Sequence, residues 1–285
     1  MSNRLKKDLW ISRRQPRVLK GKALNPNAAT EARYYAALHR LIHSMVDSTH
    51  HELRGLYAKP VAQVYFAQDD TMSAQAKIIM AKLMDKFQAI FDLAAHPTAA
   101  KMTGAETKAS AAALQQSLGQ IAGGLTLKTD ILTGDLKDIL AATIQENVQL
   151  IKSIPQKYFT EVQGAVMRSI TTGQGEADLI PFLHKQTGIT LRRAQIIARD
   201  QTRKAFSNIN FERMKKIGVT EYQWLHSAGG QKPRKLHQRM SDNIYRMDNP
   251  PVIDEKTGQR GKPGDLINCR CRMVPIIKFN EGDDV

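Results

Sequence analysis

Two cysteines and a histidine near the end of the chain have the side chains best suited to binding a metal. Cys269 and Cys271 are one residue apart, so on a strand both would face the same side. His237 would complete a three-ligand set, with His226 or Asp265 as a fourth ligand, and zinc favours thiolates and imidazoles. However, C-x-C is not the C-x-x-C of a zinc knuckle, and the chain has no second cysteine pair. We therefore expect no cofactor, with the cysteines as small buried residues and His237 bonded to a backbone carbonyl or an acid; zinc is the alternative.

The same region could be interpreted as a catalytic site. His226, His237, Asp242 and Asp265 would suit a metal-dependent nuclease, and Cys269 with His237 would suit a thiol nucleophile. The sequence has neither a carboxylate pair of recognisable spacing nor the phosphate loop G-x-x-x-x-G-K-S/T. We therefore expect no catalytic residues, and a structural and interaction protein rather than an enzyme.

The positive charge of the chain is concentrated in two segments. The 285 residues include 42 Lys and Arg against 27 Asp and Glu, a formal net charge of +15. Residues 1–22 hold eight basic side chains and one acidic one, residues 191–240 hold twelve and three, and the rest of the chain is nearly balanced. Such blocks either lie in solvent or bind a polyanion by counterion release. The polyanion expected here is double-stranded DNA.

Binding to DNA would be nearly independent of base sequence, because neither a recognition-helix motif nor an aromatic ladder accompanies the basic residues. The candidate contact residues are Arg4, Lys6, Lys7, Arg13, Arg14, Arg17, Lys20, Lys22, Arg192, Arg193, Lys215, Lys216, Lys232, Arg234 and Lys235.

An ordered series of polar and turn-forming residues marks the last hundred positions. It comprises Ile197-Ala198-Arg199-Asp200-Gln201, Asn208, Trp224, Arg234, His237, Pro250-Pro251, Pro263-Gly264 and Asn268-Cys269-Arg270-Cys271. Over about residues 160–278 this order resembles the C-terminal domain of the Mu F-like phage minor head proteins, the phage head morphogenesis family. The resemblance gives a structural role to Arg199, Trp224, His237, Pro263, Gly264, Asn268, Cys269 and Cys271.

The chain departs from the family pattern near His237. The lead-in Gln231-Lys232-Pro233 is basic where the family often has Asp or Gly, and Met240-Ser241-Asp242-Asn243 stands where a Gly usually follows. The extra cysteine pair that some members carry there is also missing from the sequence, which weakens a metal interpretation.

The resemblance implies a structural minor capsid protein of a tailed phage, inside the head near the portal vertex. Its expected partners are the portal protein, the major capsid protein and packaged double-stranded DNA, with no small-molecule substrate. It would be made in the host cytoplasm and reside in the virion. The alternative is a nuclease-like DNA-processing or packaging accessory protein that uses the same C-terminal domain.

Hydrophobic periodicity predicts a mainly helical N-terminal body. Apolar residues at three- and four-residue spacing cover 35–56, 79–94 and 136–151, with breaks expected at Pro60, Pro97 and Pro155. Further helices are expected over Tyr158–Thr172, Glu176–Gln186 and Thr190–Ile217. The long stripes at 35–56 and 79–94 exceed what a small domain can cover, so we expect them to pack on each other or on a partner.

After Gly218 the composition changes to that of strands. Val219–His226 and Arg270–Phe279 are expected to pair antiparallel, with Pro275 at an edge or a bulge. The predicted class is α+β: a basic arm at 1–22, a helical body at 23–155 with an Ala/Gly-rich linker near 98–129, and a small α+β domain at 156–280. We expect neither a secretory signal nor stable membrane insertion.

Overall fold

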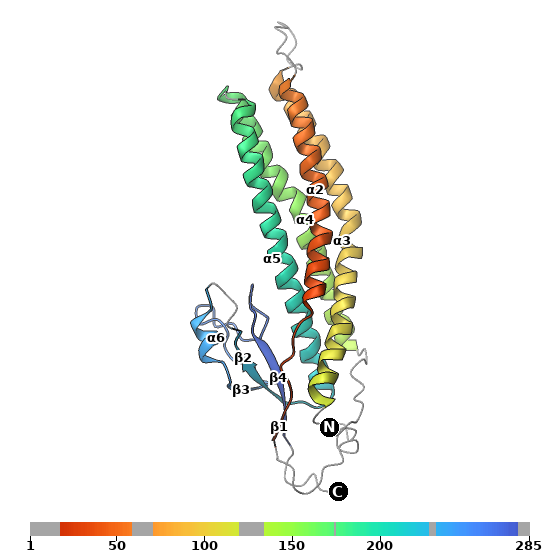
Figure 1. The fold of residues 1–285 in the computed structure, drawn as a ribbon, viewed down its shortest axis with the longest axis vertical. Helices are drawn as coiled ribbons and strands as arrows, with labels where there is room; N and C mark the ends of the chain where they lie inside the picture. Colours follow the sequence, from red (N-terminus) through yellow and green to blue (C-terminus); the bar gives the residue numbers. More distant parts are fainter. Residues whose placement is uncertain (1–17, 59–70, 120–133, 174, 228–231, 279–285) are drawn as a thin grey trace. The chain divides into compact units, whose positions relative to one another are not determined.

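The computed structural model describes residues 18–58, 71–119, 134–173, 175–227 and 232–278 (Figure 1). The predicted α+β class is confirmed. In chain order the elements are β1 (Val18–Lys20), α2 (Ala28–Ala58), α3 (Met72–Gly119), α4 (Gly134–Thr171), α5 (Glu176–Lys216), β2 (Glu221–Leu225), α6 (Lys235–Arg239), β3 (Ile244–Arg246) and β4 (Arg272–Lys278). The arm residues Arg4, Lys6, Lys7, Arg13, Arg14 and Arg17 lie outside the described residues.

The chain divides into two compact units, each built from segments that are distant in sequence. We call residues 32–101 and 144–198 the helical unit, and residues 1–31, 102–143 and 199–285 the sheet unit. The expected boundaries at residues 22 and 155 do not separate these units. No helix in the described ranges combines the length and apolar character that crossing a membrane requires.

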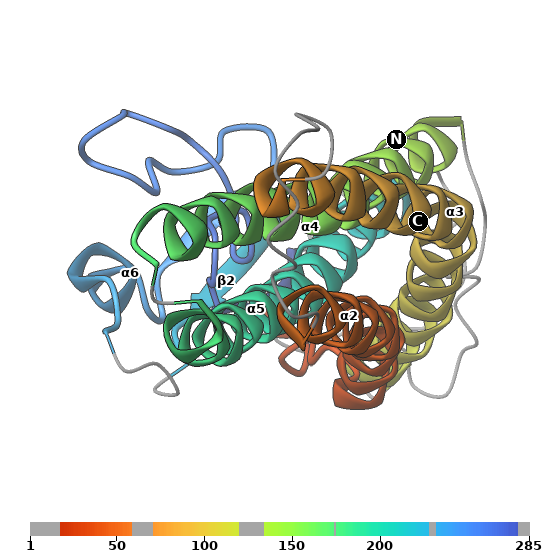
Figure 2. The same ribbon diagram turned by 90° about the horizontal axis from the view of Figure 1, so that it is seen from above.

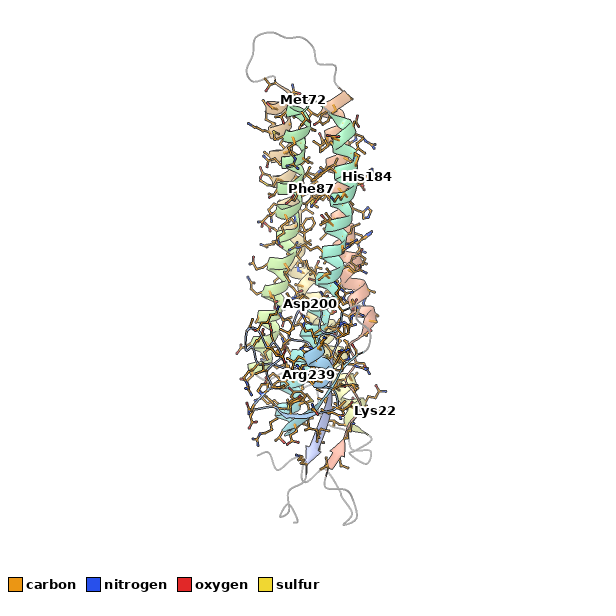
Figure 3. The ribbon with its side chains drawn as sticks, turned by 90° about the vertical axis from the view of Figure 1, so that its left-hand side faces the viewer. Lys22, Met72, Phe87, His184, Asp200 and Arg239 are labelled. Atoms are coloured by element: carbon orange, nitrogen blue, oxygen red, sulfur yellow. The ribbon has the colours of Figure 1, made fainter. Side chains whose placement is uncertain are left out.

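The helical unit is a bundle in which segments of α2, α3, α4 and α5 run side by side (Figure 2). The predicted stripe of α2 is confirmed, since Leu38, Ile42 and Met45 are fully buried. Phe87 of α3, labelled in Figure 3, stacks on Phe159 of α4 with 6.3 Å between ring centroids. The bundle core is therefore aliphatic and aromatic, as an amphipathic pattern requires.

Capping residues mark where two of these helices begin. The Asn27 side chain accepts a hydrogen bond of 2.9 Å from the Ala29 N–H at the start of α2. Thr71 accepts one of 3.2 Å from the Ala74 N–H at the start of α3. At the other end of α5, Gly218 has φ of +87°, the left-handed conformation that closes helices. The break expected at Gly218 is thus confirmed.

Three expected helix breaks are wrong. α3 runs through Pro97 to Gly119, α4 runs through Pro155 to Thr171, and α5 is one helix across Gly188. Residues 98–119 are therefore helix rather than linker, and 120–129 lie outside the described residues. An internal proline costs a helix about 3 kcal/mol, which burial of the surrounding side chains offsets.

The buried stripe of α3 also differs from the expected one. Met80, Leu83, Phe87 and Phe91 are buried. Met84, an apolar residue of the same segment, has 40% of its surface exposed and is not part of the core. The stripe expected at 79–94 is therefore present at Leu83 and Phe87, and Phe91 is buried where Ile90 is only half-buried.

The sheet unit contains one four-stranded sheet of order β1-β4-β2-β3 with antiparallel neighbours. This confirms the pairing expected for the strand after Gly218 and the last strand. Pro275 is not at an edge or a bulge, because β4 lies between β1 and β2 and its register with Tyr222 is continuous. The register with β1 ends at Ile276, and the Pro275 carbonyl accepts a hydrogen bond of 2.9 Å from the Gly21 N–H.

The core of the sheet unit joins the sheet to the ends of two helices. Tyr222 and Trp224 are fully buried on β2, as expected for two aromatics on one face of a strand. They belong to one cluster with Leu114 of α3, Phe206 of α5 and Met273 of β4. This core fixes the segment around α6 and β4 against α5.

Candidate functional site

His237, Cys269 and Cys271 meet in the sheet unit. His237 lies on α6 and is buried, Cys269 is buried, and Cys271 is half-buried just before β4. The Nδ1 atom of His237 is 3.6 Å from the Cys269 sulfur and 3.7 Å from the Cys271 sulfur. The three atoms all lie within 4.8 Å of one another.

The other two proposed ligands are not part of this group. Asp265 forms an ion pair of 2.7 Å with Lys262 and also accepts the Lys262 N–H. His226 lies half-buried after β2, where its N–H donates to the Ser241 hydroxyl over 3.2 Å. The expected face-sharing of the two cysteines is therefore realised, but the suggested fourth ligands are not gathered.

The second ring nitrogen of His237 fixes the direction of the imidazole. Nε2 is 3.1 Å from the carbonyl oxygen of Ile253. A carbonyl can only accept, so Nε2 carries the hydrogen and, in the neutral ring, Nδ1 presents a lone pair to the sulfurs. Trp224 packs edge-on against the ring with centroids 5.0 Å apart. The backbone partner expected for His237 is present beside the two thiols.

The two thiols differ in acidity. Hydrogen bonding from Cys271 lowers the pKa of Cys269 below that of a free cysteine, although burial opposes the shift. The pKa of Cys271 is raised by its interaction with Cys269 and by burial. The two thiols are therefore not equivalent, and Cys269 is the more acidic of the pair.

Two neighbouring residues of α5 hold the residue before Cys269. Asn268 has φ of +59°, and its N–H donates to a carboxylate oxygen of Asp200 over 2.6 Å. Arg199 donates to the side-chain oxygen of Asn268 over 3.0 Å. Arg199 thus bonds the side-chain amide of Asn268. Asp200 is labelled in Figure 3. Together these two hydrogen bonds connect α5 to the segment Asn268–Cys271.

The Pro263-Gly264 turn is docked on the same helix. The Ser207 hydroxyl donates to the Pro263 carbonyl. Gly264 has φ of +98°, and a Cβ added there would lie 2.9 Å from the Cβ of Ser207. Sequence reasoning missed Ser207, although Arg199, Arg203 and Ser207 recur at four-residue spacing and so share one face of α5.

All eight family-motif residues thus belong to the sheet unit and contribute to one connected region of it. The Ile253 carbonyl orients His237. Because it is a backbone group, no residue type in the sequence could have indicated this role. Beside the cysteines lies a cavity of about 20 Å³, space for one water molecule. Arg203 and Ser207 of α5 line it together with both cysteines.

The described DNA-contact candidates are mostly exposed. Arg192 and Arg193 belong to the helical unit and the others to the sheet unit. Arg193 is half-buried and donates to the Ser153 hydroxyl over 2.8 Å, and burial lowers its pKa. The exposed members are Lys20, Lys22, Arg192, Lys215, Lys216, Lys232, Arg234 and Lys235.

Three of the exposed candidates have protein partners. Lys215 lies 3.3 Å from Glu212, and Lys216 lies 3.1 Å from Asp135. Arg234 donates to the Ile267 carbonyl over 2.9 Å. The Lys216–Asp135 pair is exposed on both sides and therefore contributes little to stability.

Comparison with known proteins matches the region that holds this site. Residues 160–274 match the family model described as "Phage Mu protein F like protein". An "Uncharacterized protein" of Haemophilus influenzae (strain ATCC 51907 / DSM 11121 / KW20 / Rd) is 33% identical over 135 residues, 47% of this chain and 29% of that protein. No solved structure matches the chain. The resemblance seen in the sequence is thus confirmed over residues 160–274, which match the model of the Phage Mu protein F like family.

Proposed function

We propose that this chain is a structural minor capsid protein that acts in head morphogenesis of a tailed phage. The observation that carries the proposal is the Phage Mu protein F like match over residues 160–274, which includes all eight motif residues. Four of those residues, Pro263, Gly264, Cys269 and Cys271, line a cavity of about 20 Å³. A domain whose motif residues contact each other suits a role in assembly. Pockets that bind small substrates are about ten times larger or more.

The chain is proposed to lie inside the head near the portal vertex and to contact portal and major capsid proteins. Exposed apolar side chains on α3 support a docking role, with Leu93 at 81% and Ile78 at 52% exposure. A partner that buried these side chains would gain the free energy of removing apolar surface from water. Contact with packaged DNA is proposed to run through the exposed basic residues.

Mass spectrometry of purified virions, with copurification of the full chain, tests this assignment. Coexpressed portal or major capsid protein should be captured by the full-length chain, and Leu93→Ser should weaken capture, whereas Lys101→Gln on the same helix should not. A protein absent from virions that captures neither partner would contradict the proposal. Divalent-metal-dependent cleavage of plasmid DNA would instead favour the nuclease-like accessory role.

A further inference from the structure

We propose that His237, Cys269 and Cys271 form a zinc site, in which Nδ1 and the two sulfurs bind one Zn²⁺ ion and a fourth position takes water. The spacing of the cysteines alone favoured buried thiols without metal. The arrangement of the three donor atoms favours a bound metal instead. This inference does not depend on the proposed role in the phage head.

The distances between the donor atoms are those of a tetrahedral zinc site. Zn–S bonds of about 2.3 Å and Zn–N bonds of about 2.0–2.1 Å place a nitrogen and a sulfur about 3.6 Å apart at the tetrahedral angle. The observed distances from Nδ1 are 3.6 Å to Cys269 and 3.7 Å to Cys271. Both nitrogen–sulfur distances therefore fit one ion bound between Nδ1 and the two sulfurs.

The imidazole is already oriented as a metal site requires. The Ile253 carbonyl takes the Nε2 hydrogen at 3.1 Å, so Nδ1 is the ring nitrogen that faces the sulfurs. A ligating histidine in proteins usually donates its other N–H to such an acceptor, which fixes the tautomer and raises ligand basicity. The Trp224 ring at 5.0 Å restricts rotation of the imidazole.

The backbone around the cysteines is preorganised as well. The Cys269 N–H donates to the Leu266 carbonyl over 2.9 Å, and Asn268 is held by Asp200 and Arg199. Two thiolates, a neutral imidazole and Zn²⁺ would have no net charge together, which lowers the cost of burying the ion. Both cysteines are free, and a disulfide across one residue would be strained.

The cavity beside the cysteines leaves room for a fourth ligand. Its volume of about 20 Å³ fits one water molecule, and both cysteines line it. Three protein ligands and one open position distinguish this site from closed four-cysteine structural sites.

Metal analysis of the full-length chain tests the proposal. Protein purified in reductant without chelator should contain about one zinc per chain. Cobalt exchanged into the site should give the visible absorption of tetrahedral Co²⁺ and a thiolate charge-transfer band in the near ultraviolet. Cys269→Ser, Cys271→Ser and His237→Asn should each weaken zinc affinity by at least about tenfold, whereas His226→Asn should not change it.

Two results would overturn the zinc site. One is wild-type protein with negligible zinc and no cobalt spectrum; the other is zinc that all three variants retain, which would place the metal elsewhere. If a variant fails to fold, the wild-type cobalt spectrum and a chelator titration of the melting temperature still decide. A portal-binding defect without loss of zinc would bear on the proposed function alone.

Discussion

Asn268 holds a left-handed backbone conformation immediately before the two cysteines. With φ of +59°, it occupies a region that costs most residues about 1 kcal/mol or more, whereas asparagine tolerates it. Asn268→Ala should lower the free energy of unfolding by about 1–3 kcal/mol, measured by urea denaturation. Asn268→Gly loses the same amide but keeps the conformation, so it should cost less. Equal losses in the two variants would show that the hydrogen bond alone matters.

Gly264 is required because its φ is positive and because a Cβ there would have no space. Comparison with Gly258 distinguishes the two effects. Both Gly264 and Gly258 have positive φ, but a Cβ at Gly258 would meet nothing within 4 Å. Gly264→Ala should therefore destabilise the protein by about 1 kcal/mol more than Gly258→Ala, because its Cβ would collide with Ser207. Thermal or urea unfolding of both variants measures the difference. Equal effects would mean that the turn can move away from α5.

His50 gives the helical unit a defined dependence on pH. Burial first, then the charges of His184 and Arg54, lower the pKa of His50, while Asp47 opposes them. The unfolded chain binds a proton near pH 6.5, but the folded one resists it. Stability is therefore complete above about pH 6.5 and falls as the pH drops below it. Unfolding of His50→Gln should depend less on pH over this window; an unchanged profile would exclude His50 as the cause.

The candidate site was partly visible in the sequence. The one-residue spacing of Cys269 and Cys271 indicated a shared direction, and the motif order added His237 from 32 residues away. What the sequence could not show is the tautomer of His237, because it depends on the backbone carbonyl of Ile253. Nor could the sequence show that Asp265, whose carboxylate could bind a metal, is instead paired with Lys262.

Among the elements, α3 contains an exposed proline in its interior. Pro97 lacks the N–H that would bond the Leu93 carbonyl, and its ring crowds the preceding turn. Pro97→Ala should therefore stabilise the protein by about 1–3 kcal/mol, reduced by the greater freedom of the unfolded chain. Calorimetry should show a higher melting temperature. A lower one would indicate that the bundle needs the distortion that Pro97 imposes.

The strands β1 and β3 show why the sequence predicted only part of the sheet. Each has three residues, too few for an alternating pattern to stand out. The longer β2 and β4 carried clear strand composition and were predicted. Helix positions were predicted from periodicity, but their ends were not, because tertiary burial overrides the local effect of Pro97 and Pro155.

At the scale of the whole molecule, DNA binding should depend on the basic arm. Replacing Arg4, Lys6, Lys7, Arg13, Arg14 and Arg17 by Gln should reduce the slope of log affinity against log salt by about 0.9 for each phosphate that the arm no longer neutralises. Fluorescence anisotropy with two unrelated duplexes measures it. Substitution is preferable to deletion of 1–22, because Val18–Lys20 form β1.

A matched control exists on α3. Lys77, Lys82, Lys101 and Lys108 are exposed and lie outside both basic segments, so their replacement by Gln should leave the slope nearly unchanged. An equal reduction of the slope per charge removed in the two sets would mean that net charge, rather than the arm, attracts DNA.

The pairing of β1 with β4 has a consequence for biosynthesis. β1 is made early, yet its partner in the sheet is the segment Ile276–Lys278. At about 5–20 residues per second, the ribosome needs on the order of 10–50 s to make the intervening chain. Throughout that time Val18–Lys20 has no strand to join. The sheet can therefore close only after translation has passed β4, and a chain stalled earlier would expose its unfinished core to chaperones and proteases.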